Sequence, residues 1–520
     1  MIAPALPAYA NETYADFSLA ADRQRQVEAI AAVRGQCGRD HDNWIAGRAV
    51  QTGNWLESVN PSQPSEIIGR HAKATADQAR EAVDDAYAYF PEWAQTPVEL
   101  RVAILVRTAD ILRRRKFEFN AWLILESGKS FAEAEADTAE AIDFCEYYAR
   151  QMLRYAHPDP IVQLPGETNE MVYLPLGVGI VIPPWNFPLA ILAGTTVAAL
   201  VCGNTVVLKP SSETPIIAAK FVDALFEAGL PSRALNLCVG SGSEVGDTLV
   251  THPKTRFISF TGSREIGLRI NELAARPQPG CIWIKRVVAE MGGKDAILVD
   301  EDCNLEVAAT GVVQSAFGFQ GQKCSACSRA IVHQDVYDKF LELVKAKTEA
   351  LTQGPADDPS NHMGPVISAK AKQTISNYID TGMAEGRFIT GGATYAGEGY
   401  FIRPTVIADV DRKARIFQEE IFGPVLAVTK ARDFDHGLEL VNDSDYGLTG
   451  AAYTRDRAKL EKARRLFHVG NLYLNRKCTG AMVGAHPFGG FNMSGTDSKA
   501  GGPDYLLQFL QAKSIAEKIG

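Results

Sequence analysis

The 520-residue chain has no long uninterrupted apolar run. Its most apolar stretch, residues 172–208, is broken by four prolines, by Asn186 and by several glycines. A membrane-spanning helix needs about 20 predominantly apolar residues in succession, and each internal proline removes a helical hydrogen bond. We therefore expect no membrane insertion, and we expect this stretch to form buried strands and a helix of an α/β core.

Basic clusters of the kind that nucleic-acid binding requires are also missing. The net charge is -9, the isoelectric point is near 5.6, and Lys and Arg occur in short scattered groups such as residues 113–116. Proteins that bind the phosphate backbone concentrate positive charge on one surface. We therefore expect small-molecule partners and no nucleic acid.

The chain lacks the features of a secreted, disulfide-bonded protein. Its nine cysteines are an odd number spread over a large chain, and the N-terminal residues MIAPALPAYANETY contain no basic segment followed by an apolar run. These features favour a reducing compartment, so we expect a cytoplasmic protein. Cys324 and Cys327 form a CxxC pair, but no second CxxC and no paired histidines accompany it, so we expect no metal site.

The residues that surround Cys324 indicate a reactive thiol. The segment FGFQGQKCSACSR, residues 317–329, places glycine, glutamine, lysine and serine around it. A buried structural cysteine normally lies among larger apolar side chains, whereas a nucleophilic one needs access and polar neighbours. We interpret Cys324 as a nucleophile. The alternatives are a small core residue and, together with Cys327, a thiol redox pair.

The length and the 46% hydrophobic content predict about two or three domains with cores of their own. The first 70 residues are mixed, with a turn-rich patch at 53–60, and we expect strands packed on the first domain. Helical periodicity predicts helices from residue 75, over 98–112, up to about residue 128 and over 131–150. A proline-rich break at 157–166 and alternating residues at 170–174 predict a hairpin arm.

From residue 178 the sequence repeats the order strand, turn, helix. Short apolar strands alternate with helical stretches up to residue 262, and a second such set begins after Glu290. This order is typical of doubly wound parallel sheets in α/β proteins. We predict one such domain from residues 1–150 and 172–286, a second from residues 287–476, and an oligomerisation arm from residues 151–171 and 495–520.

Two glycine turns lie in the first domain. GSGSEVG at 240–246 follows an apolar strand and precedes a helical pattern, and FTGSREIG repeats this arrangement at 260–267. Glycines let a backbone approach a pyrophosphate at a helix N-terminus. The first turn has the spacing GxGxxxG rather than GxGxxG, and alone it would be read as a tight turn. Two such turns on adjacent strands favour a dinucleotide-binding domain.

The segment FGFQGQKC is similar to the active-site cysteine segment of the aldehyde dehydrogenase superfamily. PPWNFP, TVVLKP, EEIFGPV and the two glycine turns match the cofactor site of that family, and the resemblance extends over residues 74–520. It implies an aldehyde dehydrogenase-like fold, NAD as cofactor with NADP as an alternative, and homo-oligomers, dimers or higher, that associate through arm strands. The cofactor residues that it implies are Ile182, Pro184, Trp185, Lys209, Ser212, Gly242, Gly246, Phe260, Gly262, Ser263, Glu420 and Phe422.

One position departs from the family pattern. KPSSET places Ser212 three residues after Lys209, where many NAD-specific members have a Glu that binds the ribose hydroxyls. A serine neither binds both hydroxyls as a carboxylate does nor repels a 2′-phosphate. We therefore expect NAD to be preferred and NADP to be usable.

Aldehyde oxidation requires an adduct that can expel hydride, and a thiolate forms one by attacking the carbonyl. The resemblance implies that Cys324 makes this attack and passes through a thiohemiacetal and a thioester. It also implies that Asn186 and the backbone N–H of Cys324 hold the oxyanion, although without the family pattern Asn186 would be read as a turn-capping residue. Glu290, in AEMGGKD, would be the general base that hydrolyses the thioester.

Three segments, CSACSR, NRKCTGAMVGAHPFGGF and IWIKRVVAEMGGKD, resemble the family members that oxidise L-glutamate γ-semialdehyde in proline degradation. A serine hydroxyl and two backbone N–H groups would bind the α-carboxylate, and two rings would enclose the aliphatic carbons. The substrate residues thus implied are Phe187, Ser325, Gly480, Ala481 and Phe488. The alternatives are another semialdehyde, such as succinic semialdehyde, a betaine-type aldehyde, or a catalytically silent relative. The sequence leaves open whether Glu140 reaches the substrate.

Overall fold

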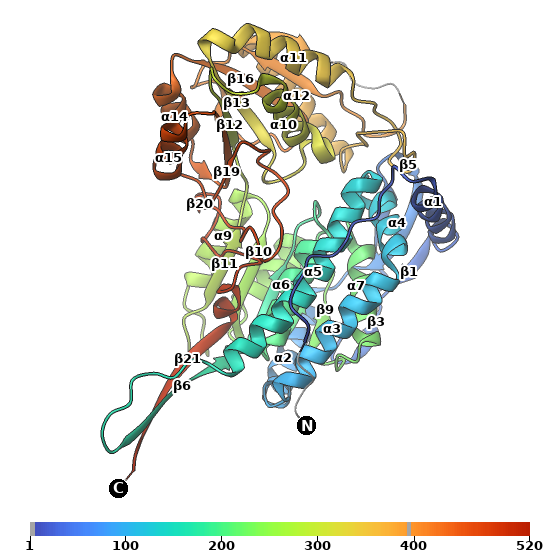
Figure 1. Cartoon of the computed structure of the whole chain (residues 1–520). Helices are drawn as coiled ribbons and strands as arrows, with labels where there is room; N and C mark the ends of the chain where they lie inside the picture. Colours follow the sequence, from blue (N-terminus) through green and yellow to red (C-terminus); the bar gives the residue numbers. More distant parts are fainter. Residues whose placement is uncertain (1–5, 393–396, 520) are drawn as a thin grey trace.

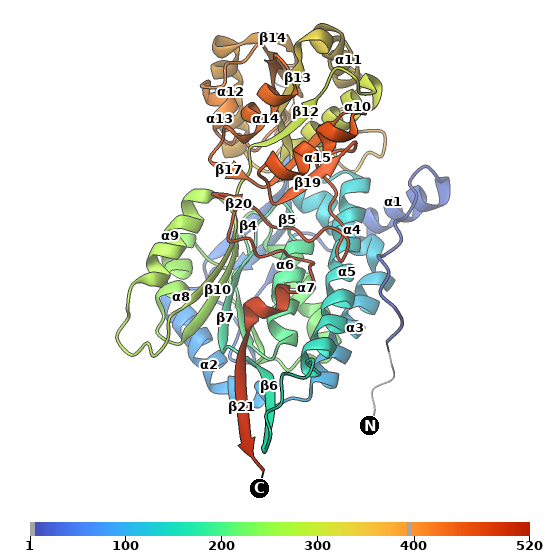
Figure 2. The same ribbon diagram turned by 60° about the vertical axis from the view of Figure 1, so that its left-hand side comes forward.

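The structure is a computed structural model that describes residues 6–392 and 397–519. Its two lobes each contain one seven-stranded sheet covered by helices, and a two-stranded arm projects from one lobe (Figures 1 and 2). The N-terminal part of the chain forms most of the lobe that carries the arm, and the following part forms the other lobe. The last described residues return to the lobe that carries the arm. The α/β class and the doubly wound parallel sheets were predicted correctly.

The N-terminal region differs from the prediction. An extended segment leads into the helix α1 (Ala20–Arg34), which was not predicted, whereas β4 (Trp55–Asn60) is one of the strands that were expected in the first 70 residues. β4 pairs with β5 (Gln63–Ala72), and β5 also pairs with β1 (Arg39–His41). The helix was missed because it is largely polar and buries only three residues, so it leaves little apolar periodicity in the sequence.

Four helices follow, at the places where periodicity predicted them: α2 (Ala76–Ala94), α3 (Val98–Arg114), α4 (Lys116–Ser127) and α5 (Phe131–Ala156). Thr75 and Gln78 form a capping box at the start of α2. Gly128 ends α4 in the left-handed conformation, with φ 70°, which glycine adopts without strain. α5 extends beyond the predicted end near residue 150 to Ala156, because Met152 and Tyr155 continue its buried face.

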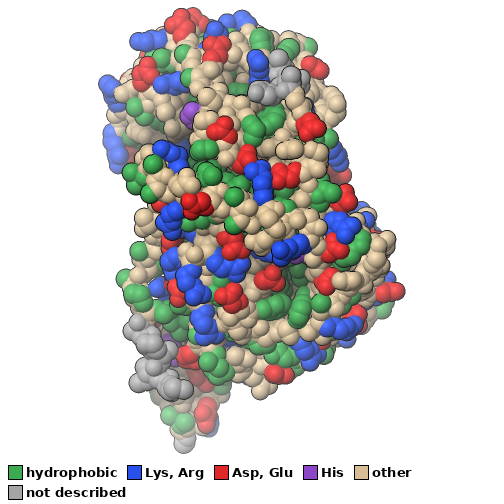
Figure 3. Space-filling model, turned by 90° about the vertical axis from the view of Figure 1, so that its right-hand side faces the viewer, with side chains coloured by type: hydrophobic (Ala, Val, Ile, Leu, Met, Phe, Trp, Pro, Cys, Tyr) green, Lys and Arg blue, Asp and Glu red, His purple; other side chains and the backbone are tan. Residues whose placement is uncertain are grey.

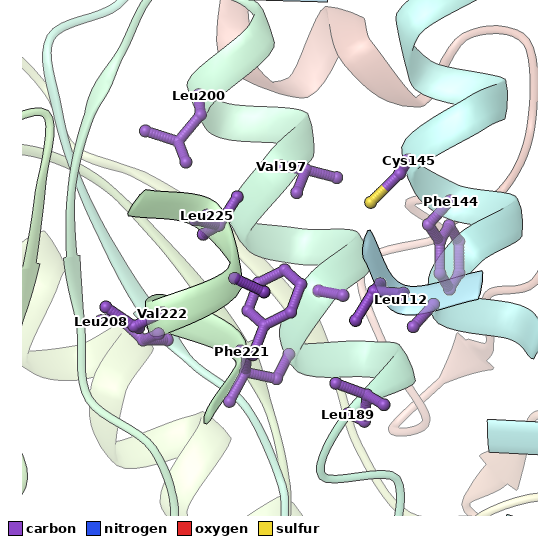
Figure 4. Close-up of a cluster of buried hydrophobic side chains, with 14 of the residues drawn as sticks. Leu112, Phe144, Cys145, Leu189, Val197, Leu200, Leu208, Phe221, Val222 and Leu225 are labelled. Carbon is purple, nitrogen blue, oxygen red and sulfur yellow. The ribbon is translucent and has the colours of Figure 1, made fainter. Parts of the chain in front are cut away.

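The first sheet has the strand order β11-β10-β7-β8-β9-β2-β3, and its first five strands are parallel. On one face lie α3 to α7, and on the other lie α2, α8 and α9. Figure 4 shows Phe144 of α5, Val197 of α6 and Phe221 of α7 converging in the first of these layers. The elements not yet bounded are β2 (Asn43–Ile45), β3 (Arg48–Val50), β7 (Val178–Ile182), α6 (Ala190–Val201), β8 (Thr205–Leu208), α7 (Pro215–Glu227), β9 (Leu235–Leu237), α8 (Asp247–Thr251), β10 (Thr255–Thr261), α9 (Arg264–Ala275) and β11 (Arg286–Glu290).

The second sheet has the order β14-β15-β16-β13-β12-β18-β19, with only β14 antiparallel to its neighbour. α10 and α11 cover one face, and α12 to α15 cover the other. Its strands are β12 (Asp295–Val299), β13 (Cys327–His333), β14 (Arg387–Thr390), β15 (Thr405–Ala408), β16 (Val425–Ala431), β18 (Thr449–Tyr453) and β19 (Asn471–Leu474). Its helices are α10 (Leu305–Phe317), α11 (Tyr337–Glu349), α12 (Ala369–Glu385), α13 (Arg415–Gln418), α14 (Phe434–Asn442) and α15 (Arg457–Leu466).

The change from one sheet to the other lies later than predicted. The expected boundary between residues 286 and 287 falls within β11, whose residues Arg286 to Glu290 all pair with β10 in the first sheet. The second sheet begins with Asp295 in β12, so the chain crosses between the lobes over residues 291–294. Glu290 is therefore the last residue of the first sheet before the crossing.

The arm is a pair of antiparallel strands, β6 (Glu167–Pro175) and β21 (Leu510–Lys518), in register over their full length. It is narrower than predicted. Residues 151–156 belong to α5, and the segment from residue 495 to the short helix η4 (Tyr505–Phe509) packs on the body of the protein, where Tyr505 and Phe509 are buried. Only residues after Phe509 enter the arm from the C-terminal side.

None of the helices in the described ranges is both long and apolar enough to cross a membrane. The face in Figure 3 intersperses acidic and basic side chains over both lobes, without a large patch of one sign. On this face the scattered Lys and Arg residues of the sequence therefore lie among acidic side chains.

Candidate active site

Two cavities meet at the thiol of Cys324. The larger, of about 530 Å³, lies at the carboxyl ends of β7 and β10, and the smaller, of about 140 Å³, lies between α5, α6 and the segments that carry Ser325 and Gly480. β7 and β10 are neighbours in the first sheet, although the strands that follow β7 in the chain extend the sheet to the other side. Ligands of open parallel sheets bind in the crevice at such a point. The nucleophile predicted from the sequence thus faces both cavities.

A strained turn presents Cys324. After α10 ends, Phe319, Gln320 and Gly321 all have positive φ values of 47°, 55° and 67°. Left-handed backbone is unfavourable for residues with a Cβ, and such conformations persist only where the surrounding structure enforces them. A Cβ on Gly321 would collide with the carbonyl oxygen of Gly423, so this position requires glycine.

The electrostatic surroundings keep the Cys324 thiol protonated in the free protein. Burial raises its pKa well above the ordinary value, and the nearby carboxylates of Asp295, Glu420 and Glu290 raise it further. A thiolate is the reactive form of cysteine. The thiol therefore has to lose its proton before it can act as a nucleophile.

Glu290, the final residue of β11, lines the smaller cavity together with Cys324. One of its carboxylate oxygens accepts a hydrogen bond from the Ser498 hydroxyl at 2.6 Å, and the other accepts one from the Gly490 N–H at 3.2 Å. Both bonds favour the ionised form, but burial outweighs them and raises the pKa of Glu290 to about 7. A carboxyl group with this pKa can take up and release a proton near neutral pH.

Asn186 follows β7 and is almost completely buried, with 4% of its surface exposed. Its side-chain amide donates a hydrogen bond to the backbone carbonyl of Gln322 at 3.0 Å. This contact spans 136 positions of the sequence, so Asn186 is not a local turn cap. The amide has a second N–H, and Asn186 borders the larger cavity next to Cys324.

The predicted cofactor residues are brought together, with two exceptions. Those that line the larger cavity are Ile182, Pro184, Trp185, Lys209, Ser212, Phe260, Gly262, Ser263, Glu420 and Phe422. Gly242 and Gly246 do not line it. The turn GSGSEVG forms a short π-helical segment instead, with Gly246 against the stem of Lys209 and open space around Gly242. The irregular GxGxxxG spacing already separated this turn from the usual pyrophosphate fingerprint.

The sequence reasoning missed one carboxylate at this cavity. Glu213, directly after Ser212, also lines it, and burial raises the pKa of its carboxyl group. In the KPSSET segment Glu213 lies one position after the place where the family pattern has its Glu. A comparison of the Ser212 position alone therefore overlooks Glu213. Glu420 was predicted, and its carboxylate accepts a hydrogen bond from the Gly293 N–H at 3.0 Å, while burial raises its pKa to about 7.

All five predicted substrate residues line the smaller cavity: Phe187, Ser325, Gly480, Ala481 and Phe488. Three further polar residues that line it were missed or left open: Tyr14, Glu140 and Lys323. Lys323 forms an ion pair of 2.7 Å with Glu133 on α5. Burial, and then the proximity of Asp137 and Asp143, raise the pKa of Glu140 to about 8. Tyr14 lies in the mixed N-terminal region, where no motif marked it.

Comparisons with known proteins agree with this geometry. The model of the aldehyde dehydrogenase family matches residues 46–515. The 1-pyrroline-5-carboxylate dehydrogenase of Geobacillus thermodenitrificans (strain NG80-2) is 58% identical over 509 residues, covering 98% of this chain and 99% of the relative. The enzyme of the same name from Bacillus subtilis (strain 168) is 54% identical with the same coverage.

Solved structures of aldehyde dehydrogenases are also similar to this chain. A 1-pyrroline-5-carboxylate dehydrogenase from Thermus with bound NAD is 49% identical, with a TM-score of 0.97 and coverage of 99% of this chain and 100% of that one. Betaine aldehyde dehydrogenase from Staphylococcus aureus in complex with NAD⁺ is 29% identical, with a TM-score of 0.88 and coverage of 94% and 96%. From the family match over most of its length and these full-length relatives, it follows that the chain belongs to the aldehyde dehydrogenase family.

Proposed function

We propose that this protein oxidises L-glutamate γ-semialdehyde, the open form of 1-pyrroline-5-carboxylate, to L-glutamate in proline degradation, with NAD as the preferred cofactor. The observation that supports it best is the smaller cavity, in which Ser325, Gly480 and Ala481 lie close to the thiol of Cys324. The names of the relatives at 54–58% identity point to the same substrate.

The first half of the reaction takes place on Cys324. Its thiol gives up its proton to solvent water, and the thiolate attacks the aldehyde carbon; a C–S bond forms as the carbonyl π bond breaks, which gives the oxyanion of a thiohemiacetal. The free N–H of the Asn186 amide and the backbone N–H of Cys324 stabilise the oxyanion. NAD, when bound, accepts the hydride, and a thioester of Cys324 is left.

The second half requires a base. Glu290 takes a proton from a water molecule, the resulting hydroxide equivalent attacks the thioester, and glutamate leaves as the thiol re-forms. The pKa of about 7 for Glu290 suits this task, because near neutral pH a substantial fraction of the carboxyl group is ionised. Its bonds to Ser498 and Gly490 orient the carboxylate.

The smaller cavity is lined by polar groups of opposite character. The Ser325 hydroxyl and the N–H groups of Gly480 and Ala481 are suited to the α-carboxylate, with the positive charge of Lys323 nearby. The Glu140 carboxyl group lines the same cavity and is suited to the α-ammonium group. An aliphatic aldehyde without these charges leaves the polar groups without a partner.

The larger cavity fits a dinucleotide. Lys209 is 6% exposed, and within the described residues its ammonium group donates one hydrogen bond, of 3.4 Å to the carbonyl of Pro210, which leaves donors for the adenosine ribose. Trp185 and Phe422 form an edge-to-face pair, with 5.4 Å between ring centroids, where the cavity reaches Cys324. Glu420 is suited to the nicotinamide ribose.

We also propose a cytoplasmic homo-oligomer, of two or more subunits, that binds neither nucleic acid nor membranes. Support comes from the arm and from apolar side chains that are exposed in the single chain. Val162, next to the arm, is 82% exposed, and Ile282 and Ile284, in the loop before β11, are 80% and 91% exposed. Large exposed apolar residues in one region are typical of association surfaces.

The test is a panel of aldehydes assayed by NADH absorbance. Glutamate γ-semialdehyde should have the highest kcat/KM, above succinic semialdehyde, betaine aldehyde and propanal. A clear preference for one of the other aldehydes would replace the proposed substrate. Absence of NADH formation with every aldehyde would favour a catalytically silent relative, and thiol-disulfide exchange without nicotinamide would favour the redox alternative.

A further inference from the structure

The extended residues 6–18, here called the N-terminal strap, cross α5 before α1 begins (Figure 1, dark blue). The Asn11 amide donates to the Asp143 carboxylate of α5 at 2.9 Å and to the carbonyl of Val483 at 3.0 Å. The backbone N–H of Glu12 donates to the other oxygen of Asp143 at 2.7 Å. The strap is therefore tied at one point both to α5 and to the loop that follows Ala481.

Further contacts hold the strap along α3, α4 and α5. Arg113 donates to the Glu12 carboxylate at 2.9 Å, Lys116 donates to the carbonyl of Thr13 at 2.7 Å, and Glu135 accepts from the N–H of Ala15 at 2.8 Å. An extended segment without backbone pairing loses much conformational entropy when it is fixed in one path. This set of charge-assisted bonds offsets that loss.

The strap also shapes residues 479–484, here called the substrate loop because it contains Gly480 and Ala481. The Tyr9 hydroxyl donates to the carbonyl of Val483 at 3.3 Å, and the Tyr9 ring lies edge-on to Tyr147 with 5.1 Å between centroids. Gly484 has φ 81°, and a Cβ there would lie 3.0 Å from the Tyr9 ring. The end of the substrate loop is thus clamped between the strap and α5.

Tyr14 brings the strap into the smaller cavity itself. It lines that cavity together with Glu140, and its hydroxyl lies 3.8 Å from the sulfur of Met482 in the substrate loop. Burial, followed by the charge of Glu140, raises the pKa of Tyr14 to about 12, so its phenol stays protonated at neutral pH. A neutral phenol can accept a hydrogen bond from an ammonium group while it packs against the substrate chain, and the arrival of that positive charge favours the ionised form of the Glu140 carboxyl group.

We propose that the N-terminal strap is a specificity-determining part of the substrate site. It holds the substrate loop so that Gly480 and Ala481 border the cavity, and Tyr14 forms with Glu140 the wall that receives the α-ammonium group of an amino-acid aldehyde. This role rests on the proposed function, because it requires a substrate with an α-amino-acid head group. Asn11 is a positioning residue in this scheme, and Tyr14 contacts the substrate.

The test compares Tyr14→Ala, Tyr14→Phe and Asn11→Ala with wild type. Thr13→Ala is the matched control, because Thr13 is exposed and only its backbone carbonyl is engaged. KM and kcat are measured for glutamate γ-semialdehyde and for propanal, and glutamate is assayed as an inhibitor of propanal oxidation. Tyr14→Ala should raise KM for the semialdehyde and Ki for glutamate roughly tenfold, as expected for loss of a hydrogen bond to a charged group, with propanal changed less than about twofold.

Tyr14→Phe keeps the ring and should show a smaller rise in the same two constants, about threefold, and Asn11→Ala should do likewise without loss of kcat on propanal. Thr13→Ala should match wild type. Equal changes for both aldehydes, or unchanged glutamate inhibition in Tyr14→Ala, would overturn the proposal. Wild type that fails to oxidise the semialdehyde would contradict the proposed function instead, and the Ki of glutamate would still decide the role of the strap.

Discussion

The two seven-stranded sheets present opposite edges to the active site. The first sheet contributes the ends of strands: Ile182 closes β7, Thr261 closes β10 and Glu290 closes β11. The second sheet contributes the loops that precede strands, with Cys324 before β13 and Glu420 before β16. In parallel sheets the carboxyl edge is the usual ligand site. Here that rule describes only the edge of the first sheet, where the proposed cofactor site lies, and the proposed nucleophile Cys324 comes from the amino edge of the other sheet.

The two cavities are also built differently. Short segments next to strands make the larger cavity, so its residues lie in a few compact motifs. The smaller cavity is lined by α5, α6, residues 323–325, the substrate loop and Tyr14, which are far apart in the sequence. Substitutions should therefore fall into three classes. Those at Cys324, where the two cavities meet, and at the proposed base Glu290 should lower activity with every aldehyde. Other substitutions that line only the smaller cavity should change the kinetic constants of the substrate, and those that line only the larger cavity should change those of the cofactor.

The largest loss of activity should come from a substitution at Cys324, where the two cavities meet. Cys324→Ala should lower kcat with every aldehyde by at least about 10⁴-fold, because the covalent route is lost. Cys327→Ala, three residues away and buried beneath the loop, is the control and should keep much of the activity. A fully active Cys324→Ala protein would refute the whole mechanism.

The next largest effect should come from Glu290→Gln, which leaves the thiol but removes the base. Steady-state turnover should fall by about 10²–10⁴-fold, and stopped-flow should show a burst of about one NADH per site before the stall. In wild type the deacylation rate should rise with pH through about 7, because Glu290 acts as a base only after it has lost its proton. Steady turnover in Glu290→Gln, without a burst, would assign the base to another group.

Ser325→Ala, in the smaller cavity, should affect the substrate and not the cofactor. Loss of a hydrogen bond to the α-carboxylate should lower kcat/KM for glutamate γ-semialdehyde about tenfold and leave propanal and the KM for NAD nearly unchanged. Paired kinetics on both aldehydes provide the measurement. Equal losses on both would mean that Ser325 supports Cys324 rather than the carboxylate.

Ser212→Glu, in the larger cavity, should affect the cofactor and not the substrate, and we expect this effect to be the smallest. A second carboxylate near Glu213 should lower kcat/KM for NADP about fivefold, in line with roughly 1 kcal/mol for a solvent-accessible charge interaction, and should change that for NAD by less than about twofold. Glu213→Gln is the reverse change and should favour NADP. If wild type already shows no NADP activity, Glu213 alone is sufficient to exclude the 2′-phosphate.

Local sequence was enough for the central elements of the fold. The strands from β7 to β10 and the helices α2 to α5 follow from apolar periodicity and from turn residues, because their burial pattern is set by neighbours in the sequence. Cys324 could be singled out as a candidate nucleophile for a similar reason, because the glycine, glutamine, lysine and serine residues that mark an accessible thiol are its neighbours in the sequence. The extent of β11 could not be predicted in this way, since its last residues are strand only because β10 lies beside them.

The rest of the site depended on contacts between distant segments. The partner of Asn186 is a carbonyl 136 residues away, and the bonds that orient Glu290 come from Gly490 and Ser498. Tyr14 belongs to a segment without periodicity, so no local pattern could connect it with the substrate. The family resemblance brought most residues of both cavities together, but it also suggested Gly242 and Gly246, which lie outside the larger cavity.

The hydrogen bonds that join Glu290 to residues about 200 positions later in the sequence have a consequence for protein synthesis. Glu290 emerges from the ribosome about 200 residues before Gly490 and Ser498, its hydrogen-bond donors. The separation in sequence is even longer between β6 and β21, since Glu167 pairs with Lys518. Contacts of such long sequence separation form late in folding. A nascent chain can thus fold its first sheet early, but Glu290 gains these two hydrogen bonds only after Ser498 has been synthesised, and the arm is complete only after Lys518.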